Sequence, residues 1–322
     1  MTYTFESLFA KRLRGFVQQK NAVGFPYHES SRLLLDFDRF CLDRFPSETA
    51  LTKEICLAWA VRKDTEANNT FRNRLMPIRE FARYLNRCGE PAFVLTPNFA
   101  KKGSRHIPHI YSEEEIAALW DILDHLRPRE GYPIRHFVLP TLVRLLYCCG
   151  LRPCEARKLR TADVDLEKGR LDIMESKGHK SRIVMMADDV AEVCRRYDEI
   201  VSRFMPGREL FFPNSDGNLY TKEWLEKTFR IAKAKAGIGT SGEHSPRLYD
   251  FRHTFATHRL YQWMRDGKDV TAMLPYLSAY MGHAQLSDTH YYIHLVPGLF
   301  EKMAGFDYSA SEHLLPEVEC DE

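Results

Sequence analysis

Apolar residues recur at helical spacing over most of this 322-residue chain. The pattern changes between residues 163 and 186, where turns separate three short strand candidates, and one further apolar run covers Leu210–Pro213. The strand candidates are Asp163–Leu166, Leu171–Met174 and Arg182–Met186. We therefore predict a mainly α fold with one small antiparallel sheet.

The first ~95 residues carry four apolar stripes of helical period, which predict a small four-helix domain over residues 1–96. Thr52 is placed to cap the third helix, and Gly89 with Pro91 ends the fourth. Pro77 lies inside the fourth stripe and predicts a kink or a break there. The stripes contain Leu8, Phe9, Leu13, Phe16 and Val17; Leu33, Leu34, Phe37, Phe40 and Cys41; Ile55, Leu57 and Trp59; and Phe71, Leu75, Ile78, Phe81 and Leu85.

Residues 97–110 are interrupted by proline and glycine and are expected to form a linker. Lys101, Lys102 and Arg105 in this segment have no acidic neighbours, so they are either DNA contacts or simply solvated charges. A second domain, residues 111–308, begins where Ser112 and Glu115 predict a capping box. Its expected helices are Ser112 to about Pro128, His136–Gly150, Asp188–Phe204, Lys222–Ala236, Thr254–Arg265, Val270–Met281 and Ser287–His294.

Charge is distributed unevenly along the chain. Residues 1–110 hold 18 Lys and Arg against 11 Asp and Glu, a net charge of +7, whereas the tail at 309–322 carries only acidic charges. The basic front half suits a polyanionic partner, and a solvated helical surface explains it equally well. None of the eight cysteines forms a C-x-x-C pair, which argues against a zinc ribbon or a disulfide framework. No secretory signal or membrane span is apparent, so we expect a cytoplasmic protein.

Five polar residues stand out because each lies at the edge of a predicted element. Arg152 follows a helix-ending glycine in Cys-Gly-Leu-Arg-Pro-Cys-Glu-Ala, and Lys177 lies in a tight turn between two strand candidates. Arg252 is in Tyr-Asp-Phe-Arg-His, His283 in Tyr-Met-Gly-His, and Tyr292 in Thr-His-Tyr-Tyr-Ile-His. Each has an ordinary structural explanation when taken alone: a surface ion pair, a turn lysine, a helix cap or a core aromatic.

Taken together, these segments resemble the tyrosine recombinase, or phage integrase, family. That family carries G-L-R-x-x-E, a lysine in a β-hairpin turn, H-x-x-R-H, L-G-H, and a tyrosine nine positions after the last histidine. The five motifs occur here in family order between about Ser112 and Leu295. The resemblance implies the DNA breaking–rejoining fold, with residues 1–96 as a core-binding domain and 111–308 as the catalytic domain.

The resemblance also implies roles that the chemistry explains. Arg152 and Arg252 would clamp the scissile phosphate, because a guanidinium binds two oxygens at once and stays charged. Tyr292 would attack phosphorus and remain joined to the 3′ side of the cut, so the bond energy is kept for rejoining without ATP or a metal. Lys177 would donate a proton to the leaving 5′ oxygen. His283 would contact the phosphate or assist the tyrosine, and Glu155 would position Arg152.

Two features depart from the family pattern or leave a choice open. Tyr249 stands where the family has the first histidine of H-x-x-R-H, and a phenol, with a reference pKa near 10, is a poorer base than imidazole. Its hydroxyl can still donate a hydrogen bond to phosphate. The adjacent tyrosines Tyr291 and Tyr292 both offer a nucleophile; the nine-residue spacing from His283 selects Tyr292.

The family's working unit implies a homo-tetramer on double-stranded DNA, with each chain clamping the duplex between its two domains and with accessory DNA-bending or recombinase partners possible. The apolar segment Val296–Tyr308 would dock on a neighbouring subunit or pack on its own domain. We expect a nucleoid-associated recombinase of a mobile element. The alternatives are a type IB topoisomerase and a DNA-binding regulator that has lost catalysis.

Overall fold

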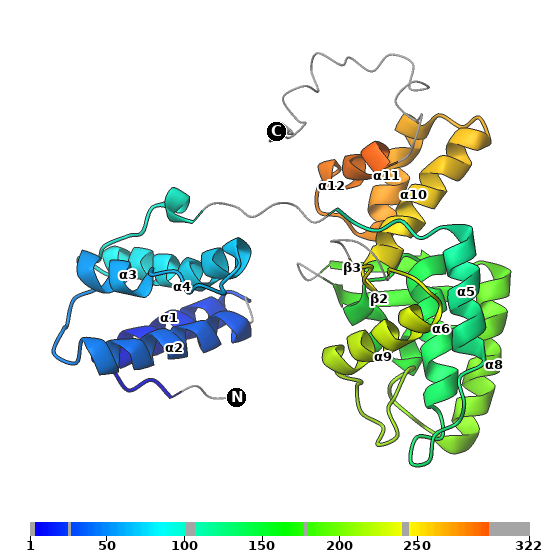
Figure 1. Ribbon diagram of the computed structural model, residues 1–322, viewed down its shortest axis with the longest axis horizontal. Helices are drawn as coiled ribbons and strands as arrows, with labels where there is room; N and C mark the ends of the chain where they lie inside the picture. Colours follow the sequence, from blue (N-terminus) through cyan, green and yellow to red (C-terminus); the bar gives the residue numbers. More distant parts are fainter. Residues whose placement is uncertain (1–3, 25–26, 101–106, 177–179, 240–244, 296–322) are drawn as a thin grey trace. The chain divides into compact units, whose positions relative to one another are not determined.

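The computed structural model describes residues 4–24, 27–100, 107–176, 180–239 and 245–295 (Figure 1). The chain divides into two compact units, Met1–His106 and Ile107–Glu322, which we call unit 1 and unit 2. The mainly α architecture with one small antiparallel sheet confirms the predicted fold class. Among the described residues, no helix has the length and apolar character needed to cross a membrane.

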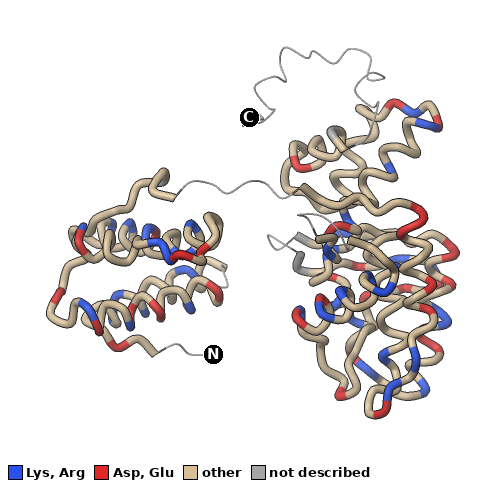
Figure 2. The backbone as a smooth tube through the Cα atoms, viewed as in Figure 1, with Lys and Arg blue, Asp and Glu red and all other residues tan. Residues whose placement is uncertain are grey.

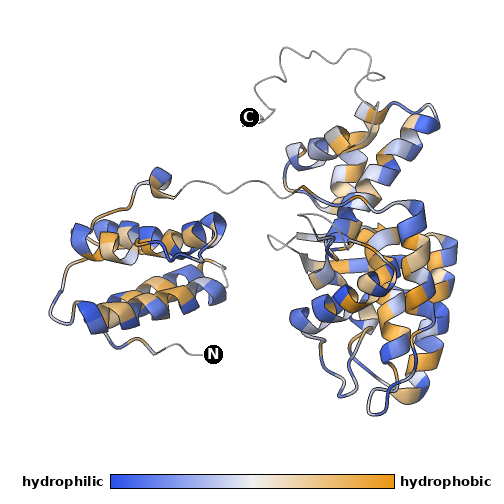
Figure 3. Cartoon of the chain, viewed as in Figure 1, coloured by the Kyte–Doolittle hydropathy of each residue, from blue (hydrophilic) through white to orange (hydrophobic). Residues whose placement is uncertain are grey.

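Unit 1 contains the helices α1 (Ala10–Ala22), α2 (His28–Arg44), α3 (Lys53–Trp59) and α4 (Asn68–Arg87), followed by a short 3₁₀ turn at Pro97–Phe99. Thr52 caps α3 as predicted, since its side chain accepts a hydrogen bond from the Ile55 amide. Apolar and polar residues lie on different sides of these helices (Figure 3), and the apolar sides form one core. Leu8 and Leu57, which the predicted apolar stripes included, are exposed, so the prediction was wrong at these two positions.

Helix α4 runs without a break through Pro77, which is buried in its middle. Lys, Arg, Asp and Glu are interspersed along the helices of unit 1 (Figure 2), so its positive charge is not concentrated in one segment.

Unit 2 begins with α5 (Glu113–Asp124), α6 (Arg135–Cys148) and the short α7 (Pro153–Lys158). Ser112 and Glu115 form the predicted capping box at the start of α5. The sheet follows, with the order β1 (Val164–Asp165), β2 (Arg170–Ser176) and β3 (Lys180–Met185), all antiparallel. Leu171 pairs with Val184, and both are fully buried, so the inner face of the hairpin belongs to the main core of unit 2.

The rest of unit 2 is helical: α8 (Asp188–Phe204), α9 (Lys222–Lys235), α10 (Asp250–Arg265), α11 (Val270–Met281), α12 (Ser287–His290) and a 3₁₀ turn, η3 (Tyr291–Leu295). A large core joins α5, α6, α8 and α9 to the sheet. A second, smaller core joins α10, α11 and η3. The candidate site residues lie on segments at the border between these two cores.

Three predicted boundaries were wrong. Helix α5 ends at Asp124, with His125 as its C-cap, rather than near Pro128. Helix α10 begins at Asp250 rather than Thr254; the Asp250 carboxylate accepts from the Arg247 amide and fixes this end. The last predicted helix divides into α12 and η3.

Candidate active site

Arg152 lies between the end of α6 and the start of α7. Gly150, two residues earlier, has a φ of 59°, and a Cβ atom there would lie 2.5 Å from Cδ1 of Phe255. Only glycine therefore allows both the left-handed turn and the close packing against α10. This turn directs the Arg152 side chain toward the end of α11, where Nη2 donates to the carbonyl oxygen of Gly282 at 3.2 Å.

Arg252 lies in the first turn of α10 and its side chain is fully buried. Its Nη1 donates to the carbonyl oxygen of Gly150 at 2.7 Å, and its Nη2 donates to the carbonyl oxygen of Met281. Its Nε is buried and has no hydrogen-bond partner among the described residues. The Arg252 guanidinium thus connects the segment before Arg152 with the segment before His283.

His283 directly follows α11, which ends in a left-handed glycine, Gly282, with a φ of 65°. The amides of Gly282 and His283 donate back to the carbonyl oxygens of Ala279 and Ser278, as in a Schellman motif. Nδ1 of the imidazole lies 2.7 Å from the hydroxyl oxygen of Thr289, which is fully buried in α12. The turn that follows α11 fixes the backbone of His283, and the hydrogen bond to Thr289 fixes the orientation of its ring.

Tyr292 lies in η3 and is 3% exposed. Its ring stacks with that of His283 at a centroid distance of 5.9 Å, and it lies 5.5 Å from the ring of His253. The charges of Arg252 and Arg152 both act on its phenol. Tyr291 is less buried, and its ring contacts His253 and Tyr292. The structure thus brings Arg152, Arg252, His283 and Tyr292 together.

Glu155 accepts hydrogen bonds from Arg152 and from an arginine that sequence reasoning missed, Arg182 on β3. Arg152 donates to it through Nη1 at 2.6 Å and through its backbone amide at 2.9 Å. Arg182 donates through Nη1 at 2.9 Å and Nη2 at 2.8 Å. The strand pattern held a signal: Arg182 alternates with Val184 and Met186, so it occupies an inward-facing position where a charge is unusual.

Tyr249 immediately precedes α10 and is 40% exposed, in contrast to the buried Tyr292. Its ring lies 5.3 Å from that of His253, and its hydroxyl interacts with the Arg152 guanidinium. The residue in the family's histidine position therefore lies within the same cluster and reaches solvent.

The electrostatics of the cluster follow from three guanidiniums around one carboxylate. Burial, followed by the charge of Arg152, lowers the pKa of Arg252 to about 10. Burial and the charges of Arg252, Arg152 and Arg182 lower the pKa of His283 to about 3, so its imidazole is neutral at physiological pH. Burial raises the pKa of Tyr292 to about 12, although the two nearest arginines oppose the rise. Burial also acts to lower the pKa of Arg152, but its interactions with Glu155 and Tyr249 outweigh this and raise it.

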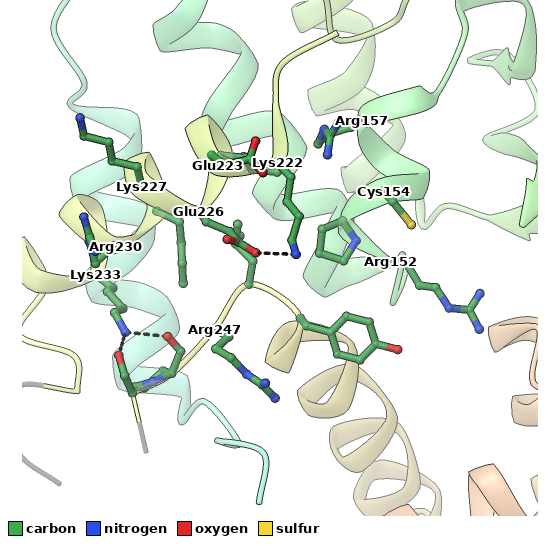
Figure 4. Close-up of a pocket in the computed structure, with 17 residues that line it drawn as sticks. Arg152, Cys154, Arg157, Lys222, Glu223, Glu226, Lys227, Arg230, Lys233 and Arg247 are labelled. Carbon is green, nitrogen blue, oxygen red and sulfur yellow. Dashed lines mark hydrogen bonds and ion pairs between the residues drawn. The ribbon is translucent and has the colours of Figure 1, made fainter. Parts of the chain in front are cut away.

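A cavity of about 890 Å³ adjoins the cluster at Arg152 and Tyr249. It lies among α7, α9 and residues 245–249, and Figure 4 shows the charged side chains that line it. Lys233 is tied to its wall by hydrogen bonds to Ser245 and to the Pro246 carbonyl oxygen. The basic lining residues are Arg152, Arg157, Lys222, Lys227, Arg230, Lys233 and Arg247, against the acidic Glu223 and Glu226.

Four predicted site residues, Lys177, Lys101, Lys102 and Arg105, lie outside the described residues, as does Val296–Tyr308. In the sequence, Lys177 directly follows β2 and precedes β3, and both of these strands are described. Within the described part of the chain, no group of three or more His, Cys, Asp or Glu side chains is arranged to hold a metal ion.

Comparison with known proteins gives a consistent result. The model of the phage integrase family matches residues 111–297. A putative integrase/recombinase, y4rB, from Sinorhizobium fredii (strain NBRC 101917 / NGR234) is 31% identical, covering 92% of this chain and 96% of the relative. The tyrosine recombinase XerC of Chlorobaculum tepidum is 30% identical over 69% of this chain and 68% of its own. The crystal structure of the XerH site-specific recombinase bound to palindromic difH substrate, a post-cleavage complex, has a TM-score of 0.63 at 20% identity and covers 94% of this chain and 84% of its own.

Proposed function

The chain belongs to the phage integrase family, and from this premise we propose that it is a mobile-element recombinase that cuts and rejoins double-stranded DNA through a 3′-phosphotyrosyl bond at Tyr292. Membership of this family makes the chain a recombinase of the tyrosine type. We further propose the covalent mechanism, the roles of the residues and the biological setting.

The observation that carries the proposal is the unmatched charge around Arg252. This buried guanidinium contacts only backbone carbonyl oxygens, and its Nε has no partner among the described residues. Arg152 and Arg182 meanwhile share the single carboxylate of Glu155. Among the described residues, three guanidiniums therefore meet one carboxylate, an excess of about two positive charges that is costly in a buried place unless an anion binds there.

A phosphodiester is an anion and therefore suits this positively charged cluster, which stabilises it further as its negative charge increases during the reaction. The diester carries one negative charge, and the five-coordinate species formed by attack on phosphorus carries two. Arginines that are fixed before the reaction stabilise the second charge as it develops, and this lowers the barrier rather than only tightening substrate binding. Arg152 and Arg252 are held by backbone carbonyl oxygens and by Glu155, which is the kind of support such a site needs.

In the proposed step, the phenol oxygen of Tyr292 forms a bond to phosphorus, and the bond from phosphorus to the 5′ oxygen breaks. Lys177 donates a proton to that oxygen, while the phenol proton passes to a base. His283 would accept this proton once a bound phosphate offsets the arginine charges that lower its pKa, or would donate a hydrogen bond to the phosphate, whereas Tyr249 supplies a hydroxyl donor. Attack by a 5′ hydroxyl of another strand reverses the step, so neither ATP nor a metal ion is consumed.

The basic cavity beside Arg152 supports a duplex as the substrate. Seven of its lining residues are basic and two are acidic, and they adjoin the proposed scissile position (Figure 4). We propose that this cavity takes the DNA backbone next to the cut, and that unit 1 with Lys101, Lys102 and Arg105 binds the same duplex, so that affinity falls steeply with salt. A tetramer would hold the two duplexes whose strands are exchanged.

The test begins with duplexes selected from a random pool by the full chain at low protein and moderate salt. A selected duplex with a nick beside the cut traps covalent protein, because the short cleaved strand diffuses away. We expect an SDS-resistant adduct that Tyr292→Phe abolishes and the neighbouring control Tyr291→Phe retains, with unchanged duplex affinity in both.

The same reagents separate the alternative functions. Joint molecules between two plasmids that carry the selected site support recombination. Relaxation of a supercoiled plasmid without joint molecules would indicate a topoisomerase, and tight binding without any adduct would indicate a regulator. A Tyr292→Phe protein that still forms the adduct would remove the assigned nucleophile.

A further inference from the structure

We propose that Arg182 is a positioning residue for the reaction: it holds Glu155 and the end of α11 so that Arg152 keeps its place for the phosphate and Glu155 does not neutralise it. The inference rests on the proposed function and adds a residue on the sheet to it. Arg182 contacts both of the groups that support the Arg152 guanidinium, Glu155 and the turn at Gly282.

The first contact is a fork between Arg182 and Glu155. Two hydrogen bonds of 2.9 and 2.8 Å join Nη1 and Nη2 to the two carboxylate oxygens. The Glu155 side chain is 4% exposed and that of Arg182 is 9% exposed, so water competes little with this pair. A bidentate pair of this kind is strong and geometrically specific, and lysine cannot reproduce it.

The second contact anchors the end of α11. Nε of Arg182 donates to the carbonyl oxygen of Tyr280 at 2.8 Å. The arginine also passes directly beneath Gly282, where a Cβ atom would lie 2.9 Å from its Cδ. Gly282 in turn offers the carbonyl oxygen that accepts from Arg152, and it precedes His283. Glycine is needed at 282 for its positive φ and also to admit the Arg182 side chain.

The consequence for Arg152 is electrostatic as well as geometric. Glu155 would form a closed pair with Arg152 if it had no other partner, and that pair would compete with the phosphate for the guanidinium. Because Arg182 occupies both carboxylate oxygens, Glu155 orients Arg152 without neutralising it. Loss of Arg182 should therefore slow cleavage far more than it weakens DNA binding, which depends on many phosphate contacts.

The experiment compares Arg182→Gln, Arg182→Lys and the control Arg196→Gln, which removes an exposed arginine of α8. Single-turnover adduct formation on the nicked selected duplex gives the cleavage rate, and equilibrium binding gives the affinity. We expect Arg182→Gln to slow cleavage about 100-fold with affinity within about threefold of wild type, since small misplacements of a catalytic group have effects of this size. Arg182→Lys should recover part of the rate, and Arg196→Gln should match wild type.

A double-mutant cycle tests whether Arg182 acts through Glu155. Glu155→Gln should also slow cleavage about 100-fold, and the Arg182→Gln/Glu155→Gln protein should be no slower than the slower single variant, because the competing carboxylate is gone. A double loss equal to the product of the two single losses would overturn the coupling. Equal falls in rate, affinity and thermal stability, with no recovery by lysine, would reduce Arg182 to a structural residue.

Adduct formation by the wild-type protein distinguishes a failure of the proposed function from a failure of the role proposed for Arg182. If wild type forms no adduct on any selected duplex, the proposed function fails. If wild type forms the adduct and Arg182→Gln forms it at the same rate, the proposed function stands and the role of Arg182 is wrong.

Discussion

Each unit of this protein buries an arginine, and the two arginines are satisfied in opposite ways. In unit 1, Arg74 is 9% exposed and binds both carboxylate oxygens of Glu66 at 2.8 Å. Its remaining hydrogen bonds go to the carbonyl oxygens of Trp59 and Val61. The charge of Arg74 is therefore matched by an equal and opposite charge in direct contact.

In unit 2, Arg252 is fully buried and has no carboxylate within ion-pair distance among the described residues. Carbonyl oxygens satisfy two of its nitrogens but do not neutralise its charge, and nearby Arg152 adds to it. Burial of an arginine is therefore not sufficient evidence of a functional site. The ion pair of Arg74 with Glu66 stabilises the fold. The charge of Arg252, which no carboxylate neutralises among the described residues, costs stability that an anionic ligand can offset.

We expect the largest difference in cleavage rate when each of these two arginines is replaced by lysine. Arg252→Lys should slow cleavage of the selected duplex about 1,000-fold, because lysine cannot reach both carbonyl oxygens and a phosphate from one planar group. Arg74→Lys should leave the cleavage rate per folded molecule near wild type but lower the free energy of unfolding by about 2 kcal/mol, since the buried fork with Glu66 is lost.

Single-turnover rates and thermal melting of both variants provide the measurement. If Arg74→Lys slowed cleavage as severely as Arg252→Lys while staying folded, the contrast between a structural and a functional arginine would not hold.

The sequence predicted the elements of this fold well where the pattern was long and periodic. The bounds of α8 and α11 agree with the prediction, and the three strands lie within a few residues of theirs. The boundaries that failed were set by tertiary contacts: α10 begins four residues early because Asp250 is held by the Arg247 amide, which no periodicity reveals.

The site was predictable to the extent that motifs and spacing specify it. Motif order indicated Arg152, Arg252, His283 and Tyr292, and the structure brings these four together. The catalytic roles stay predictions. Arg182 was missed because its partner Glu155 is 27 residues away, and only the folded hairpin brings the two into contact. The buried Thr289 beside His283 was missed for the same reason: a hydroxyl carries no signal until its neighbours are known.

We expect a smaller difference, in stability, between alanine variants of two glycines that each follow a helix, one in each unit. Gly89 after α4 and Gly150 after α6 both have positive φ, but a Cβ atom at 89 would meet nothing within 4 Å, whereas one at 150 would meet the Phe255 ring at 2.5 Å. Gly89→Ala should cost about 1 kcal/mol of stability from the backbone alone. Gly150→Ala should cost about 3 kcal/mol, because the ring must also move.

Cleavage extends this comparison, since the Gly150 carbonyl oxygen accepts from Arg252. We expect Gly150→Ala to slow adduct formation about 10-fold at a temperature where it is fully folded, and Gly89→Ala to leave the rate unchanged. Chemical denaturation and the nicked-duplex assay measure the two quantities. Equal effects of the two alanines on both would mean that the turn at Gly150 carries no functional constraint.

The smallest expected effect is on the pH dependence of stability. His283 has a pKa of about 3 in the folded protein because burial and the arginines disfavour its charged form, whereas an unfolded histidine has a pKa near 6.5. Between these values the unfolded chain binds more protons, so the stability of unit 2 should fall as the pH is lowered below about 6.5. His258 and His136, whose pKa values burial also lowers, act in the same direction. Melting temperatures at pH 7, 6 and 5 should therefore fall less for His283→Asn than for wild type, but the difference should not disappear.

DNA binding tests directly whether the arginine charges lower the pKa of His283. The arginines hold the His283 pKa down because their charge is unmatched, and a phosphate placed among them would match it. A selected duplex should therefore raise the pKa of His283, which nuclear magnetic resonance can follow through the imidazole C–H signals. A His283 pKa that did not move on binding would show that the phosphate goes elsewhere, and the unmatched arginines would then need a different anion.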